Sequence, residues 1–259
     1  NCSVKNVCIA YGSGPRGDTD ETCSYETVIG LFEAALQCEW TGPAADDLYP
    51  KHHNVLSTPT VIDTPHDSGN AVEIVVPTYN YTDGGNESAQ GSNANYYGVI
   101  RIFNGETCEL LESIYDPENH VIASSPLTIA DVDKDGHVEI IAQRGKVHKS
   151  STASYGLVMF KWNETDKKYE TAWATSETSA TSRRWDGPAM HDINDDGIPE
   201  IISYGEVFDA LTGKRLNPDN ASTDINSGNG AFSVVGDIDN DGKVELLSRK
   251  GIYEWDNAQ

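Results

Sequence analysis

The stretch that decides the fold is ADVDKDGHVEII at residues 130–141, because it returns as HDINDDGIPEII at 191–202 and as GDIDNDGKVELL at 236–247. Each copy places Asp first, Asp or Asn two residues later and Asp two residues later again. Gly follows directly, and Glu stands three residues beyond the Gly. A unit that repeats along a chain predicts the architecture before any single element does.

The residues around each copy follow the pattern of short strands. Apolar runs such as SPLTIA at 125–130 enter the acidic stretch, and β-branched runs such as VEIIAQ at 138–143 leave it. Two further runs follow in each unit, and Gly, Asn and Asp separate them as in hairpin turns. We therefore predict an all-β protein with four antiparallel strands per unit. A segment at 25–40, YETVIGLFEAALQCEW, fits a helical face as well as a strand.

The acidic stretches have the composition of cation-binding loops. Calcium prefers six to eight oxygen ligands, and the Gly at the sixth position permits a sharp turn around the ion. Positions one, three, five and nine would give side-chain oxygens, and position seven a backbone carbonyl. We therefore predict about three Ca²⁺ sites. Their candidate ligands are Asp131, Asp133, Asp135, His137 and Glu139; Asp192, Asn194, Asp196, Ile198 and Glu200; and Asp237, Asp239, Asp241, Lys243 and Glu245.

The motif differs from the EF-hand, which begins in the same way. An EF-hand takes a bidentate Glu at position twelve and lies between two helices. Here position twelve is Ala142, Ser203 or Ser248, the acid stands at position nine, and a β-branched run follows. The loop is therefore predicted to join two strands. Position two is apolar in all three copies, which predicts a side chain turned toward the core.

A degenerate fourth copy is TVIDTPHDSGNAVEIVVP at 60–77. Its candidate ligands are Asp63, Asp67 and Glu73, but two extra residues separate the first acid from the last, and Asn70 stands where the Gly should be. We expect the same hairpin here without a complete calcium site. The intervals between the four copies are long and unequal, which suits propeller blades better than a solenoid.

With these residues in view, the chain resembles the FG-GAP or VCBS repeats of integrin-α-like β-propellers, from about residue 31 to the end. The resemblance implies that each loop joins the first and second strands of a blade, that calcium holds the hairpin without doing chemistry, and that residues 31–40 form an outer strand. Such propellers usually have about seven blades, whereas three units and a partial fourth are visible. Either further blades are supplied by the same protein or a partner chain, or residues 31–40 complete the last blade and close a four-bladed ring.

The cysteines point to an oxidising compartment. Cys2, Cys8, Cys23 and Cys38 lie close together, whereas Cys108 stands alone. We expect disulfides that tie down a segment with little core of its own, and the sequence leaves open which cysteines pair. A Cys-rich segment at 1–30 is predicted to precede the blades at 31–259. Free or metal-ligating thiols are the alternative. A secreted or cell-surface protein is the expectation, with possible glycosylation at four sequons: Asn80, Asn86, Asn163 and Asn220.

Charge excludes two classes of partner. The chain carries 41 acidic and 18 basic residues, a formal net charge of −23, so nucleic acid and anionic membranes would be repelled. No apolar run approaches the roughly 18–20 residues of a membrane span. Asn1 is not an initiator Met and begins no signal-peptide pattern, so we expect a mature or excised chain.

Two functions remain open. The first is an extracellular binding or adhesion module for a glycan or protein ligand, in which an insertion at 78–98 presents aromatic side chains among Gly, Asn and Ser. Its candidate ligand residues are Tyr79, Tyr81, Tyr96 and Tyr97. The second is a polysaccharide lyase, because some calcium-bearing propellers that this chain resembles are lyases of uronic-acid polymers. A lyase would need a base and a cation together, and the crowded candidates are His52, His53, Arg183 and Arg184. Nothing in the sequence brings them together, so the binding module is favoured and no catalytic residue is assigned.

Overall fold

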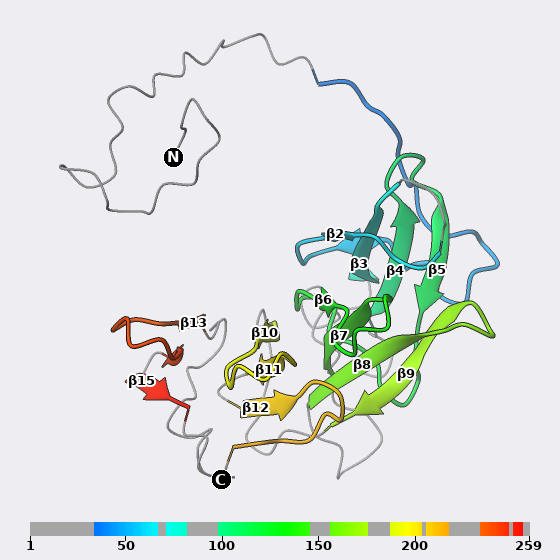
Figure 1. Ribbon diagram of the computed structural model, residues 1–259. Coiled ribbons are helices and arrows are strands. Elements are labelled where there is room, and N and C mark those ends of the chain that lie inside the picture. The colour runs from blue at the N-terminus through cyan, green and yellow to red at the C-terminus, as the bar shows by residue number, and fades with distance from the viewer. Residues whose placement is uncertain are drawn as a thin grey trace, which may run out of the picture. The chain divides into compact units, whose positions relative to one another are not determined.

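The computed structural model describes residues 34–66, 71–81, 98–145, 156–175, 187–203, 206–217, 234–248 and 251–255. The chain divides into two compact units, Asn1–Leu36 and Gln37–Gln259. The described residues of the second unit form antiparallel β-sheets (Figure 1), and no helix occurs among them. The all-β prediction is therefore confirmed. None of the described segments is a helix long and apolar enough to cross a membrane.

The first sheet contains five strands, in the order β1-β3-β4-β5, with β2 also paired to β3. Glu73 of β3 pairs with Ile62 of β2 at one end, and Tyr79 pairs with Asn54 of β1 at the other. Its strands are β1 (Asn54–Val55), β2 (Thr60–Ile62), β3 (Glu73–Tyr79), β4 (Val99–Asn104) and β5 (Leu110–Ile114).

Three further antiparallel sheets follow in chain order. The second has the predicted four strands: β6 (Thr128–Ala130), β7 (Glu139–Arg144), β8 (Gly156–Asn163) and β9 (Lys168–Ala174). The third shows three strands within the described residues: β10 (Ala189–His191), β11 (Glu200–Ser203) and β12 (Glu206–Asp209). The fourth likewise shows three: β13 (Val234–Gly236), β14 (Glu245–Ser248) and β15 (Gly251–Glu254).

The sheets pack on one another through the alternating side chains of their central strands. On β7, Ile140 belongs to the core shared with the first sheet, whereas Ile141 belongs to the core shared with the third sheet. On β11 the alternation repeats, because Ile201 faces the second sheet and Ile202 the fourth. Successive residues of a strand point to opposite faces, so an apolar run such as VEIIAQ serves two interfaces at once. This explains why the runs that leave the acidic loops are apolar at consecutive positions.

The segment at 37–53 lies on the first sheet. Cys38 forms a disulfide with Cys108, the side-chain amide of Gln37 donates to the backbone carbonyl of Glu106 at 3.1 Å, and Trp40 contacts Phe103 with ring centroids 4.8 Å apart. Residues 34–40 form neither strand nor helix. The expectation of an outer strand at 31–40, completing the last blade, is therefore wrong for the described residues, because the disulfide holds this segment against the first sheet.

The disulfide answers one pairing question that the sequence left open. Cys108, which stands apart in the sequence, is bonded to Cys38 of the cysteine cluster. The bond joins residues that are 70 positions apart, a separation that local sequence patterns do not reveal. Cys2, Cys8 and Cys23 lie outside the described residues. A disulfide is in keeping with an oxidising compartment.

Arg101 is the largest fully buried polar side chain under this segment. It is 0% exposed, and its guanidinium donates to both carboxylate oxygens of Asp47 at 2.9 and 3.1 Å. It also donates to Ser113 Oγ at 2.6 Å and to the carbonyl of Tyr49 at 3.2 Å, and its Cζ lies 5.5 Å from the ring centroid of Trp40. The hydrogen bond from Arg101 is the main cause that lowers the pKa of Asp47. A buried charge with these partners ties the segment to β4.

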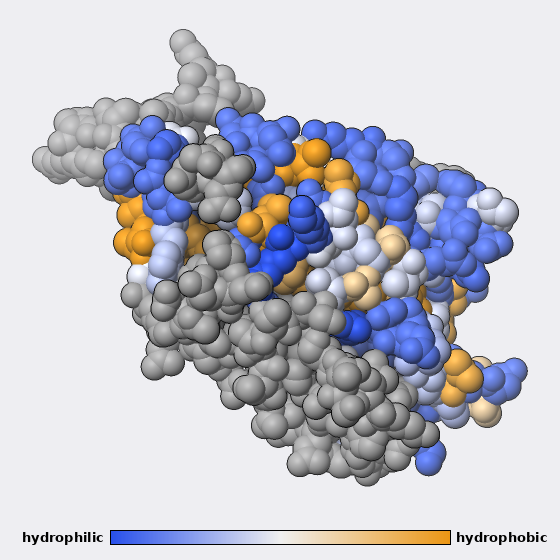
Figure 2. Space-filling model, turned by 90° about the horizontal axis from the view of Figure 1, so that it is seen from below, coloured by the Kyte–Doolittle hydropathy of each residue, from blue (hydrophilic) through white to orange (hydrophobic). Residues whose placement is uncertain are grey.

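The outer surface is largely hydrophilic on the face that Figure 2 presents. Hydrophilic residues cover much of its described part, with smaller apolar areas between them.

Candidate metal centres

The three acidic stretches form loops that join the first and second strands of consecutive sheets, as predicted. They connect β6 to β7, β10 to β11 and β13 to β14. Each loop closes with the same hydrogen bonds. In the first loop the amides of Asp135 and Gly136 donate to the two carboxylate oxygens of Asp131 at 3.1 and 3.0 Å, and the amide of His137 donates to Asp135 Oδ1 at 2.8 Å. The equivalent bonds in the other two loops are 2.8–3.1 Å long.

The backbone conformation repeats with the hydrogen bonds. The glycine at position six has a positive φ in every loop, for example 93° at Gly136, as expected for a position that favours glycine. Position four is also left-handed, at Lys134, Asp195 and Asn240, with φ between 58° and 62°. That second position is not visible from the sequence, because its residue type varies and a Lys is uncommon there. Three loops with one backbone geometry indicate one shared role.

The glutamate at position nine is buried beneath each loop. Glu139 is 0% exposed, Glu200 4% and Glu245 7%, and in each case one carboxylate oxygen accepts the amide of position two at 2.8–2.9 Å. The second oxygen of Glu139 is buried and has no hydrogen-bond partner. Burial raises the pKa of Glu139 to about 7, and burial also raises the pKa of Glu200. A carboxylate oxygen that is buried without a donor calls for a positive charge beside it.

The oxygens converge closely enough for one cation. In the first loop, oxygens of Asp131, Asp133 and Glu139 all lie within 4.8 Å of one another, and the third loop repeats this with Asp237, Asp239 and Glu245. Two ligands of one calcium ion lie no more than about 5 Å apart, given bonds of roughly 2.3–2.6 Å. These two clusters could therefore hold a metal ion, and hard oxygen donors suit Ca²⁺.

The second loop has a neutral residue, Asn194, at position three, where the other two loops have Asp. The side-chain amide of Asn194 donates to Glu200 at 2.9 Å. An amide also offers an oxygen, and the orientation of an Asn side chain follows from its partners. Its oxygen accepts the amide of Asp196 at 2.9 Å, so the second loop offers the same donor types as the other loops with one fewer charge.

The degenerate loop forms the predicted hairpin between β2 and β3. Glu73 is 0% exposed, and it accepts the amide of Thr64 at 2.6 Å, as the glutamates of the other loops accept the amide of position two. Asp63 is exposed and Asp67 lies outside the described residues. The loop thus keeps the buried glutamate despite its two extra residues. The structure gathers no cluster of three acids among the described residues of this loop.

Position two behaves as predicted in two of the three loops. Val132 is 1% exposed and Ile193 is 9% exposed, and both belong to cores between sheets. Ile238 is 45% exposed, so the inward orientation predicted there is wrong. The reason lies in the packing, because Val132 and Ile193 are covered by the sheet that follows in the chain, whereas no sheet follows the fourth among the described residues.

We expect stability to depend on pH through Glu139 when a chelator is present. Its pKa is raised from 4.5 to about 7, so the folded state binds a proton more tightly than the unfolded state. Stability therefore falls as pH rises from about 4.5 to about 7. Melting temperatures across this range should show the decline, and Glu139→Gln should reduce it, whereas Glu109→Gln, on an exposed residue, should not. Calcium should suppress the decline by favouring the ionised carboxylate; equal slopes for wild type and Glu139→Gln would contradict the assignment.

The residues predicted to bind a ligand or to carry glycans lie in different environments. Tyr79 is 3% exposed and packs with Ala123, so it belongs to the core, whereas Tyr81 is 54% exposed. Asn80 is also buried, at 3% exposed. Asn163 holds a tight turn, since its side-chain oxygen accepts two backbone amides at 2.9 and 3.2 Å. Tyr96, Tyr97, Asn86 and Asn220 lie outside the described residues.

The lyase candidates are not brought together among the described residues. His52 is 5% exposed and its ring lies against Tyr49, with centroids 4.9 Å apart, whereas His53 is exposed. Arg183 and Arg184 lie outside the described residues. A buried histidine is poorly placed to take a proton from a polymer.

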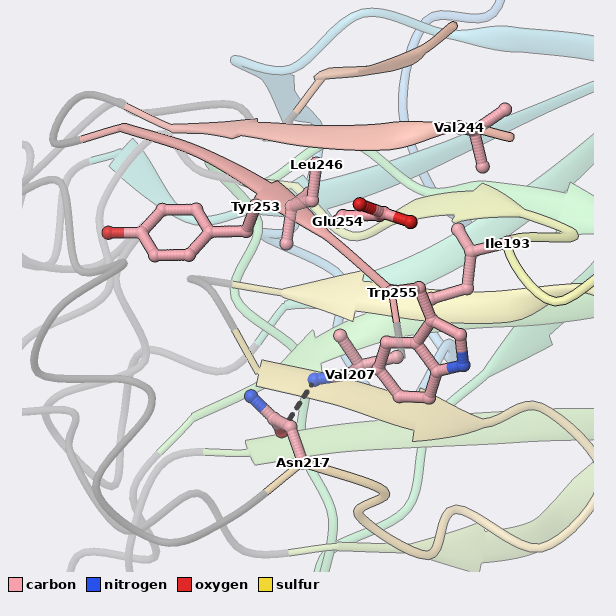
Figure 3. Close-up of a pocket in the computed structure, with 8 residues that line it drawn as sticks. All are labelled: Ile193, Val207, Asn217, Val244, Leu246, Tyr253, Glu254 and Trp255. Carbon is pink, nitrogen blue, oxygen red and sulfur yellow. Dashed lines mark hydrogen bonds between the residues drawn. The ribbon is translucent and has the colours of Figure 1, made fainter. Parts of the chain in front are cut away.

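Two cavities near the loops were not indicated by the sequence. A polar cavity of about 270 Å³ lies between the degenerate loop and the first acidic loop, with Asp63, His137 and Glu164 among its lining residues. An apolar pocket of about 180 Å³ lies between the third and fourth sheets, where Trp255 lies beside Val207 and Ile193 (Figure 3). Both cavities follow from the packing of one sheet on the next.

Comparison with known proteins gives a likeness of fold. No protein-family model matches the chain, and no curated protein sequence matches it. Among solved structures, the V. cholerae biofilm matrix protein Bap1 is similar over 85% of this chain and 32% of its own, with a TM-score of 0.56 and 20% identity. The rhamnogalacturonan lyase YesW is similar over 76% of this chain and 36% of its own, with a TM-score of 0.50 and 17% identity. The chain thus spans about a third of the structures that it matches.

Proposed function

We propose that this chain is part of an extracellular β-propeller of the FG-GAP or VCBS type, in which calcium in the three acidic loops holds consecutive blades and the module binds a glycan or a matrix protein. The observation that carries the proposal is the threefold repetition of a loop that closes over a buried glutamate. The disulfide between Cys38 and Cys108 supports an extracellular location.

The role assigned to calcium is structural. In each loop the residues at positions one and three, such as Asp131 and Asp133, would bind the ion. The buried glutamate at position nine would bind it from the second strand. The ion would supply the positive charge that the second oxygen of Glu139 lacks. It would also hold each loop against the sheet that positions it. A site in which several carboxylates converge on one ion is suited to rigidity.

The proposed ligand class rests on the fold of its neighbours. A biofilm matrix protein and a polysaccharide lyase share the fold, and fold alone does not distinguish binding from catalysis. Binding is favoured because His52, one of the lyase candidates, is buried. The exposed Tyr81 marks where the aromatic insertion begins, and such side chains can stack on sugar rings.

A panel of acidic and neutral polysaccharides with two readouts tests this function. We expect the protein to bind at least one of the polysaccharides in the presence of calcium. Chelator should abolish this binding, because removal of calcium loosens the loops. No unsaturated product should be detected by ultraviolet absorbance. Release of such products would establish a lyase instead. Failure to bind any glycan or extracellular matrix protein while the chain remains folded would contradict the binding role.

A further inference from the structure

Lys161 on β8 reaches the first acidic loop. Its ammonium donates to Asp133 Oδ2, and it lies 3.0 Å from Asp135 Oδ2. The hydrogen bond to Asp133 is the main cause that raises the pKa of Lys161 above its ordinary value. Its side chain is 36% exposed, so the head group lies at the border of the loop and solvent. A fixed cation therefore contacts two of the carboxylates that would bind a metal ion.

The equivalent positions in the other sheets carry the opposite charge. Ile140 pairs with Phe160, so Lys161 stands opposite the buried Glu139 in the next register position. In the third sheet the residue opposite Glu200 is Asp209, and in the fourth the residue opposite Glu245 is Glu254. The residue at this position of the third strand is thus a cation in the sheet of the first loop and an anion in the sheets of the second and third loops.

Other cations also lie near the loops. In the third loop, Lys243 ion-pairs with Glu254 on the neighbouring strand. Lys134 extends from the first loop toward the second, where its ammonium lies 3.2 Å from the point at which a Cβ on Gly197 would stand. His137 lies 3.1 Å from Glu164 and 3.7 Å from Asp135. Lys161 thus holds two carboxylates of one loop at once.

We propose that Lys161 is an internal competitor for the divalent cation, which weakens calcium binding at the first loop. The inference rests on the proposed calcium binding. Asp133 and Asp135 give their oxygens either to the ammonium or to a divalent ion, and an ammonium left nearby repels that ion. The first loop is consequently supported by its own chain at calcium concentrations that leave it unfilled.

Calcium titration of the whole chain by isothermal calorimetry tests the competition. We expect Lys161→Met to tighten one of three sites by about fivefold, the upper range for a partly exposed ion pair, and to leave the other two unchanged. Lys161→Arg keeps the positive charge, so the calcium affinity of the first loop should stay as low as in the wild type. Lys168→Met is the matched control, because Lys168 lies on the next strand and pairs with Glu170, away from the loop.

Melting in chelator provides a second readout that needs no bound ion. Lys161→Met should melt below Lys168→Met, because the carboxylates of the first loop then repel one another, and calcium should narrow or reverse the difference. If the wild-type chain has three calcium sites and Lys161→Met changes none of them, the proposed competition is wrong, whereas the proposed function stands. A wild-type chain that binds no calcium would overturn both.

Discussion

Excess calcium added to chelator-treated protein is expected to raise the melting temperature by about 15–30 °C. An ion that binds only the folded state at about a hundred times its dissociation constant stabilises by about 2.7 kcal/mol. Three such loops would together contribute about 8 kcal/mol, and about 2–4 °C per kcal/mol is typical for a unit of this size. The gain should follow calcium concentration, as linkage requires.

The source of this gain is the relief of buried charge. Glu139 and Glu245 are almost fully buried beneath acidic loops, so each folded loop holds several carboxylates close together. Without a cation these charges repel one another and lack full solvation. Magnesium should give a smaller increase, because it prefers a tighter octahedral shell and releases water reluctantly. An unchanged melting temperature in excess chelator would contradict the prediction.

Arg101→Met is expected to lower stability by about 3–5 kcal/mol, or about 10 °C in melting temperature. The substitution leaves Asp47 without its guanidinium partner at a side chain that is only 15% exposed. It also removes the cation that lies on Trp40. Thermal and urea unfolding in excess calcium would measure the loss with the loops filled.

The control variants separate this ion pair from a general effect of charge. Lys168→Met removes an exposed pair and should cost less than about 1 kcal/mol. Adding Asp47→Asn to Arg101→Met should recover part of the loss, because the unpaired carboxylate is removed. If Arg101→Met unfolds no more easily than Lys168→Met, then the segment at 37–53 is not held by this contact.

The parts of the structure that the sequence predicted are local ones. Asp131, Asp135 and Gly136 lie within six residues of one another, so their spacing alone indicates the turn and its donors. The strands on either side follow from runs of β-branched residues. The buried Glu139 belongs to the same motif, although only the structure shows that one of its carboxylate oxygens has no hydrogen-bond partner.

The parts that the sequence missed depend on residues far apart in the chain. Cys38 and Cys108 are brought together by the fold, and no spacing rule connects them. Lys161 reaches the first loop only because β8 pairs with β7 in one particular register. Exposure of Ile238 reflects the absence of a following sheet among the described residues, a property that its own apolar character does not reveal.

Counting bound ions tests the central claim most directly. Native mass spectrometry of the whole chain after equilibration with calcium should show three ions per molecule, and Asp131→Asn, Asp192→Asn or Asp237→Asn should each reduce the count to two. Chelator should remove all three. A chain that retains no calcium, or a count that none of these substitutions lowers, would contradict the assignment of the acidic loops as calcium sites.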